Sequence, residues 1–162
     1  MEADIEQLQD KYLNKDFDTK RFLIEAETTV RFAWLCGEIN EKFTDAAHPD
    51  FQAPPTFVGS LAGSRILPSD FPRFGVGMDA GKSVECFAPI RPGNEITGKS
   101  HLHEIYAKTG RSGRMIFIVT RIEFYDQNEK HLANSDSRIV IAERQNGCLL
   151  YTSDAADETC RG

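Results

Sequence analysis

The spacing of apolar residues divides the chain into a helical first part and a strand-rich second part. Between residues 27 and 36 the apolar side chains recur at helical spacing and leave few polar positions between them. A helix that is apolar on nearly all sides is expected to be enclosed by the rest of the fold. Gly37 follows it, and a residue without a Cβ atom suits the left-handed conformation that closes a helix. The apolar positions are Val30, Phe32, Ala33, Trp34, Leu35 and Cys36.

The second part contains four runs that are typical of β-strands and are separated by turn residues. They span residues 83–90, 94–109, 113–126 and 137–144. In the third run Met115 and Phe117 face one way while Ile116 and Ile118 face the other, as in a strand at the middle of a sheet. A helix followed by four strands predicts an α+β fold, in which an antiparallel sheet wraps around one long central helix.

Three further segments complete a single predicted domain over residues 1–146. Residues 3–13 have the pattern of a short surface helix, and residues 21–25 that of an edge strand. Residues 58–77 contain four glycines and two prolines, which indicates a loop. A loop of this length is either functional or a crossover that covers one end of the sheet, and both interpretations stay open.

Composition and charge limit the classes of partner. The chain of 162 residues has 19 Lys and Arg against 25 Asp and Glu, and it has no long basic run, which argues against a nucleic-acid partner. No apolar stretch is long enough to span a membrane, and the acidic N-terminus does not have the form of a secretory signal. We therefore expect a cytoplasmic protein with no membrane contact and with reduced cysteines.

The last residues do not fit the domain pattern. Residues 148–158 resemble a translated sequencing adapter, so we expect residues 147–162 to be non-native or, alternatively, a disordered tail. The first interpretation implies that the natural chain continues differently after residue 146, into a second module if the protein has one.

The turn after the first long helix resembles a known family. Residues 37–45 read Gly-Glu-Ile-Asn-Glu-Lys-Phe-Thr-Asp, and residues 53–57 read Ala-Pro-Pro-Thr-Phe. Both stretches resemble the MaoC-like hydratases and dehydratases, which have the hot-dog fold and the signature Gly-Asp-x-Asn-Pro-x-His-x-Asp. In this chain Glu38 stands at the position of the catalytic Asp, Glu41 at that of the Pro, and Phe43 at that of the catalytic His.

The resemblance implies an enoyl-thioester hydratase or the reverse 3-hydroxyacyl-thioester dehydratase. The substrate would be an acyl thioester of coenzyme A or of acyl-carrier protein, and no cofactor is implied. The reaction needs an acid and a base around one water, and Phe43 cannot transfer a proton. Glu38 and Asn40 remain weak catalytic candidates, because hydrogen bonds within a turn are the better explanation of both residues.

A second set of candidate residues comes from the same resemblance. In the family the Pro-Pro segment lines the mouth of the tunnel for the acyl-pantetheine arm, and alternatively the segment is a rigid plug at the sheet edge. No metal site is predicted, because His101 and His103 have no third ligand at a suitable spacing. The predicted substrate-binding residues are Phe43, Pro54, Pro55, Thr56 and Phe57.

Two functions follow from these candidates. The first is a non-catalytic half that lines the substrate tunnel and pairs with a homologous catalytic hot-dog, either a separate subunit or a second domain, as a homodimer or heterodimer. Open sheet edges favour such pairing. The alternative is a stand-alone acyl-CoA thioesterase or hydratase that uses Glu38 or Asp45.

Overall fold

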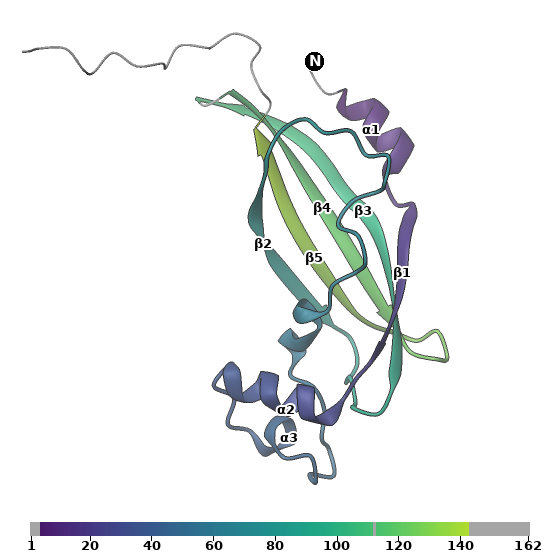
Figure 1. Ribbon diagram of the computed structural model, residues 1–162, viewed down its shortest axis with the longest axis vertical. Helices are drawn as coiled ribbons and strands as arrows, with labels where there is room; N and C mark the ends of the chain where they lie inside the picture. Colours follow the sequence, from purple (N-terminus) through teal and green to yellow (C-terminus); the bar gives the residue numbers. More distant parts are fainter. Residues whose placement is uncertain (1–3, 112, 143–162) are drawn as a thin grey trace, which may run out of the picture.

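The sheet contains five antiparallel strands in the order β1-β3-β4-β5-β2, and it is strongly curved (Figure 1). The computed structural model describes residues 4–111 and 113–142. The strands are β1 (Asp16–Leu23), β2 (Gly77–Cys86), β3 (Glu95–Gly110), β4 (Gly113–Tyr125) and β5 (His131–Ala142). The helices are α1 (Ile5–Tyr12), α2 (Ala26–Leu35), α3 (Glu41–Thr44) and the 3₁₀ helix η1 (Pro55–Ser60).

The predicted strands are present, and β4 lies at the centre, as its two apolar faces indicate. The boundaries differ most at two strands: β2 spans Gly77–Cys86 and not residues 83–90, and β5 begins at His131 and not at residue 137. Its first half is polar, and Asn134 and Asp136 pair with β4 residues across the ladder. A search for alternating apolar residues misses this segment, because its only apolar residues, Leu132 and Ala133, are adjacent in sequence, although both are buried in the core.

The inner face of the sheet carries two separate apolar cores with hydroxyl side chains between them. The η1 core is formed around Phe57, Val58 and Phe124, and the α1 core around Leu102 and Ile118. β3 and β4 are long enough to contribute to both cores. The hydroxyl residues between the cores are Ser100, Thr120 and Ser135, all buried.

Residues 61–76, which we call the strap, cross the inner face between η1 and β2 (Figure 1). Side chains fasten its backbone: the Thr120 hydroxyl donates to the Ile66 carbonyl at 3.0 Å, and the Tyr12 hydroxyl donates to the Asp70 carbonyl at 2.8 Å. Phe71 and Phe74 of the strap pack against the α1 core. The strap and α1 therefore cover much of the face on which a long helix was predicted.

The hot-dog sheet agrees with the predicted fold class, but no long central helix is found in the described part of the chain. α2 has ten residues and lies at one end of the sheet (Figure 1). The expected enclosure of Trp34 and Leu35 is wrong, since they are 69% and 81% exposed. Only one side of α2 meets the core, through Ala33 and the edge-to-face contact of Phe32 with Phe57. Helical spacing of apolar residues reveals a helix, but it does not reveal which sides are covered.

Gly37 has a φ of +73°, which confirms the predicted left-handed turn after α2. Within residues 4–111 and 113–142, no helix is long and apolar enough to cross a membrane. The predicted tail at 147–162 lies outside the described residues.

Candidate functional site

The turn that follows α2 holds both weak catalytic candidates, and its backbone uses their polar atoms. One carboxylate oxygen of Glu38, Oε1, accepts hydrogen bonds from the N–H groups of Ile39 at 2.9 Å and Asn40 at 3.0 Å. The Asn40 side chain caps α3 by accepting from the Lys42 N–H at 3.2 Å. The turn interpretation therefore accounts for both residues, and only the second oxygen of Glu38 is left for any other role.

The position of the family's imidazole holds a buried aromatic ring. Phe43 is 8% exposed, and the Lys42 ammonium lies 4.6 Å from its ring centroid. His48 does not take over the missing role, because its Nδ1 accepts the Asp50 N–H at 3.0 Å in a local turn. No group that relays a proton is hydrogen-bonded to Glu38 in the described part of the chain.

Asp45, the other acid of the alternative function, is also part of a turn. Its Oδ1 accepts the Ala47 N–H at 2.8 Å, and its own N–H donates to the Glu41 carbonyl. Its side chain is exposed to solvent. An exposed carboxylate with a backbone partner has none of the burial or charge pairing that activates a nucleophile or base.

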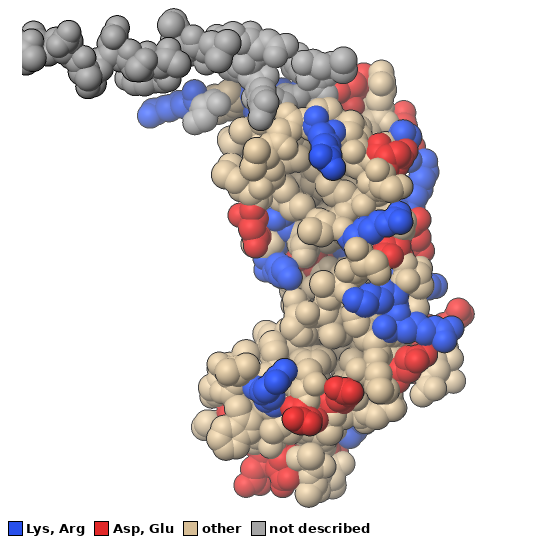
Figure 2. All heavy atoms as spheres, viewed as in Figure 1, with Lys and Arg blue, Asp and Glu red and all other residues tan. Residues whose placement is uncertain are grey.

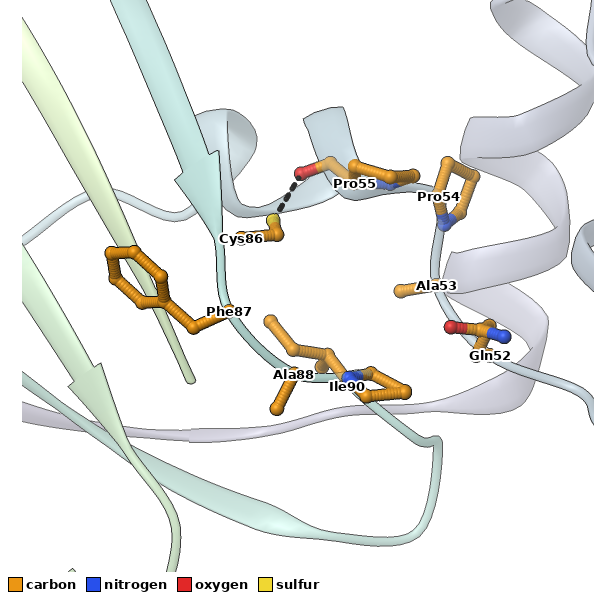
Figure 3. Close-up of a pocket in the computed structure, with 9 residues that line it drawn as sticks. Gln52, Ala53, Pro54, Pro55, Cys86, Phe87, Ala88 and Ile90 are labelled. Atoms are coloured by element: carbon orange, nitrogen blue, oxygen red, sulfur yellow. Dashed lines mark hydrogen bonds between the residues drawn. The ribbon is translucent and has the colours of Figure 1, made fainter. Parts of the chain in front are cut away.

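The Pro-Pro segment lies beside a cavity of about 250 Å³. Figure 3 shows Pro54, Pro55 and Cys86 around this space. The Cys86 thiol lies 3.2 Å from the Pro55 carbonyl and donates to it, and burial raises the pKa of the thiol above its usual value. A protonated thiol is a poor nucleophile, so the cavity contains no activated cysteine.

The predicted substrate-binding residues are not all at this cavity. Pro54 and Pro55 line it, whereas Thr56 is exposed and is not among its lining residues. Phe57 is 3% exposed and belongs to the η1 core, and Phe43 is the buried residue of α3. The segment thus packs as a plug at the end of the sheet and also walls a cavity. Substrate binding by the five residues stays a prediction.

Sequence reasoning did not single out a bidentate ion pair between two neighbouring strands. On the outer face of the sheet the Arg121 guanidinium and the Asp136 carboxylate form a bidentate ion pair, with N–O distances of 2.7 and 2.9 Å. They are direct partners across β4 and β5, so the register of these strands brings them together. Burial is the largest single influence on Asp136 and opposes its ionisation, but the hydrogen bonds and the charge of Arg121, with smaller contributions from His103 and Arg138, together outweigh burial and lower the pKa of the carboxyl.

His101 lies beside this pair and is only 7% exposed. Burial lowers its pKa, and this effect outweighs the attraction of the Glu123 and Asp16 carboxylates. The His103 ring is 5.7 Å away, centroid to centroid. No group of three or more His, Cys, Asp or Glu side chains suited to a metal ion is found in the described residues.

Comparison with protein families gives one match that covers most of the chain. The model described as FAS1-like, dehydratase domain region, matches residues 13–135. Among curated proteins no match is found.

Several solved structures share the fold. A MaoC-like dehydratase from Phytophthora capsici is 21% identical, with a TM-score of 0.62 over 90% of this chain and 56% of that one. This chain therefore spans little more than half of that protein. The ChsH1-ChsH2 complex from Mycobacterium tuberculosis is 18% identical, with a TM-score of 0.63 over 88% of this chain and 91% of that one.

A third similar structure is the HadBC complex of Mycobacterium tuberculosis, a 3R-hydroxyacyl-ACP dehydratase. It is 17% identical, with a TM-score of 0.58 over 79% of this chain and 99% of that one. At these identities the likeness concerns the fold. Two of the three structures are complexes of two different subunits by their names.

Proposed function

Because the chain belongs to the FAS1-like dehydratase domain region family, within the MaoC-like hot-dog dehydratases, we propose that it is the non-catalytic half of an enoyl-thioester hydratase or 3-hydroxyacyl-thioester dehydratase. Its role is to pair its β-sheet with that of the catalytic partner and to line part of the substrate tunnel. A homologous hot-dog, as a separate subunit or a second domain, supplies the acid and base. The substrate is an acyl thioester of coenzyme A or acyl-carrier protein.

The observation that carries this proposal is the state of the turn at residues 37–45. Hydration of an enoyl thioester places a hydroxyl on one carbon and a proton on its neighbour, and so needs a base for water and an acid for carbon. In this turn Glu38 is bound to two backbone N–H groups, and Phe43 presents a ring without a transferable proton. One carboxylate oxygen by itself cannot perform both transfers.

The similar structures support the partner. The ChsH1-ChsH2 and HadBC structures are two-subunit complexes, and the match covers only 56% of the Phytophthora chain, which leaves length for a further unit there. The edge strand β2 also favours pairing, because nine of its ten residues are exposed.

The test is an activity assay of the chain alone and with a partner. The purified chain alone should not hydrate crotonyl-coenzyme A. A 1:1 mixture with a homologous subunit that carries the Gly-Asp-x-Asn-Pro-x-His signature should hydrate it faster than that subunit alone. Robust hydration by the chain alone would refute the proposal.

The same assay decides the alternative of a stand-alone thioesterase or hydratase. Release of free coenzyme A, or hydration, by the chain alone would support it if Glu38→Gln or Asp45→Asn abolished the reaction. Glutamine is the matched replacement for Glu38, because its amide oxygen can still accept the N–H groups of Ile39 and Asn40.

A further inference from the structure

Part of the outer face of the sheet is apolar. On β4 the side chains of Met115, Phe117 and Val119 lie on this face, because they alternate with Ile116 and Ile118, which belong to the α1 core on the inner face. A strand that is apolar on both faces normally has an element packed over each of them. The outer side of β4 therefore raises the question of what covers it.

The strand register extends this apolar surface across the sheet. Phe117 pairs with Tyr106 of β3 on one side and with Val140 of β5 on the other, and Val140 in turn pairs with Met78 of β2. These four residues form one row across four strands. Two further residues of β4 extend the row along that strand. We call this surface the outer patch, and its residues are Met78, Tyr106, Met115, Phe117, Val119 and Val140.

The described part of the chain leaves the outer patch uncovered. None of its residues belongs to either apolar core. The helices α1 and η1 and the strap pack on the inner face, which faces the viewer in Figure 2 as in Figure 1. In the outer patch Met78 is 52% exposed, and Tyr106 and Phe117 are half-buried by their neighbours within the sheet. A contiguous apolar surface of this kind marks a protein contact.

The centre of the outer patch is an ordered aromatic pair. The rings of Tyr106 and Phe117 stack with their centroids 5.1 Å apart and their planes 7° apart. The Lys108 ammonium lies 5.3 Å from the Tyr106 centroid and 5.8 Å from that of Phe117. Aromatic side chains are enriched at protein interfaces, because they bury a large area and lose little rotamer freedom.

Three charged side chains frame the outer patch. Glu104 and Lys108 lie two residues before and after Tyr106 on β3, and therefore on the same face. Arg138 of β5 and Glu104 both pair with Val119, one on each side of it. Glu104 is exposed and forms no ion pair with another described residue. An apolar centre with a charged rim is the normal anatomy of a protein interface.

The charges of this rim are self-complementary. A two-fold axis in the plane of the sheet, through Phe117, sets the outer patches of two copies face to face. If the axis runs across the strands, Glu104 of one copy lies opposite Lys108 of the second copy. If it runs along β4, Glu104 lies opposite Arg138 of the second copy. In both cases the remaining cation lies opposite Ala142, so no two like charges meet.

We propose that the outer patch is an interface between two copies of this chain, packed with their outer faces together. Sheets that pack face to face lie about 10 Å apart, a space that aromatic and methionine side chains from both sheets can fill. The contact leaves the backbone edge of β2 free. It therefore goes beyond the proposed function and is compatible with a catalytic partner at that edge.

The experiment is sedimentation equilibrium of the full chain alone, over about a hundredfold range of concentration. The chain should self-associate. Phe117→Glu should weaken the association by about tenfold or more and halve the mass of the largest species, because it places two carboxylates at the centre of an apolar interface. Far-UV circular dichroism checks that the variant is folded.

Tyr125→Glu is the matched control for Phe117→Glu. Tyr125 is also an aromatic residue of β4 on the outer face, and its ring stacks on that of His131 with the centroids 5.0 Å apart. It lies outside the outer patch, so its replacement should leave the self-association unchanged.

A second variant tests the charged rim at an exposed position, where folding is not at risk. Glu104→Lys should weaken the self-association by about fivefold, because it sets a cation against Lys108 or Arg138 of the second copy. Glu95→Lys is its control, since Glu95 lies on the same strand, is exposed, and is outside the outer patch. It should have no effect.

Three results would overturn the proposal. The first is a chain that stays monomeric throughout, as expected if the outer patch contacts a different protein or a lipid surface. The second is equal association of the unaltered chain and Phe117→Glu, which would assign the contact to another surface, such as the β2 edge. The third is equal weakening by Phe117→Glu and Tyr125→Glu. Because no partner subunit or substrate is used, these results are independent of the hydration assay.

Discussion

Glu38 illustrates how a single residue can keep a family position while its chemistry changes. Its Oε1 atom is bound to two N–H groups that follow the left-handed Gly37, and its side chain is half-buried. The carboxylate therefore organises the exit from α2. Phe43, at the position where the resemblance places an imidazole, is buried and has no proton to transfer.

We expect Glu38→Ala to lower the free energy of unfolding by about 1 to 2 kcal/mol, because two N–H groups lose their acceptor. Glu38→Gln should cost less than about 0.5 kcal/mol, since an amide oxygen can replace the carboxylate oxygen. Urea unfolding followed by circular dichroism measures both. Equal losses for the two variants would contradict this structural role.

The buried His101 predicts a pH dependence of stability. Because burial lowers its pKa, the unfolded chain takes up a proton on this residue at a higher pH than the folded chain does. The free energy of unfolding should therefore fall as the pH is lowered through the ordinary histidine range, by at most about 1.4 kcal/mol per pH unit.

Urea unfolding at pH 7.5, 6.5 and 5.5 measures this slope. His101→Gln should flatten it, because glutamine cannot take up a proton. An unchanged slope in the variant would show that His101 does not contribute.

At the scale of elements, strand pairing and the covering of one element by another decide boundaries and exposures that the spacing of apolar residues does not predict. β5 extends to His131 because its polar first half pairs with β4, and α2 exposes Trp34 because it lies at the end of the sheet. The strap has no regular structure, and side chains from α1 and β4 fasten it. Each of these features depends on a partner far away in the sequence.

The register of β4 and β5 predicts the effect of breaking the Arg121–Asp136 pair. Arg121→Ala should lower the free energy of unfolding by about 2 to 4 kcal/mol, because the Asp136 carboxylate remains largely buried without its partner. The double variant Arg121→Met/Asp136→Leu should recover most of this loss, because it leaves no unpaired charge.

The matched control for this pair is Arg21→Ala. The Arg21–Glu95 pair is 3.4 Å apart and exposed, so its loss should cost less than about 0.5 kcal/mol. Urea unfolding of the four proteins tests the comparison. A double variant no more stable than Arg121→Ala would contradict the argument.

At the scale of the whole molecule, one sheet supports two cores. β3 and β4 contribute residues to both cores, so the strands of one core cannot unfold while those of the other stay folded. The strap crosses the inner face at the hydroxyl residues between the cores, and the open edge of β2 is available for a partner sheet.

This arrangement predicts a single cooperative unfolding transition. Leu102→Ala in the α1 core and Phe124→Ala in the η1 core should each cost about 3 to 5 kcal/mol, since both side chains are fully buried. Both variants should shift the same transition in near-UV and far-UV circular dichroism. Two separate transitions in either variant would show that the cores unfold independently.

The sequence by itself determined the presence and order of the strands, the left-handed turn at Gly37 and the absence of an imidazole at Phe43, because periodicity, a missing Cβ atom and side-chain identity are local properties. Only the tertiary structure decided that Trp34 is exposed, that the strap covers the inner face, and that Arg121 meets Asp136. These features depend on the register of the strands and on which element covers which face of the sheet. Register and coverage are both determined by contacts between residues that are distant in the sequence.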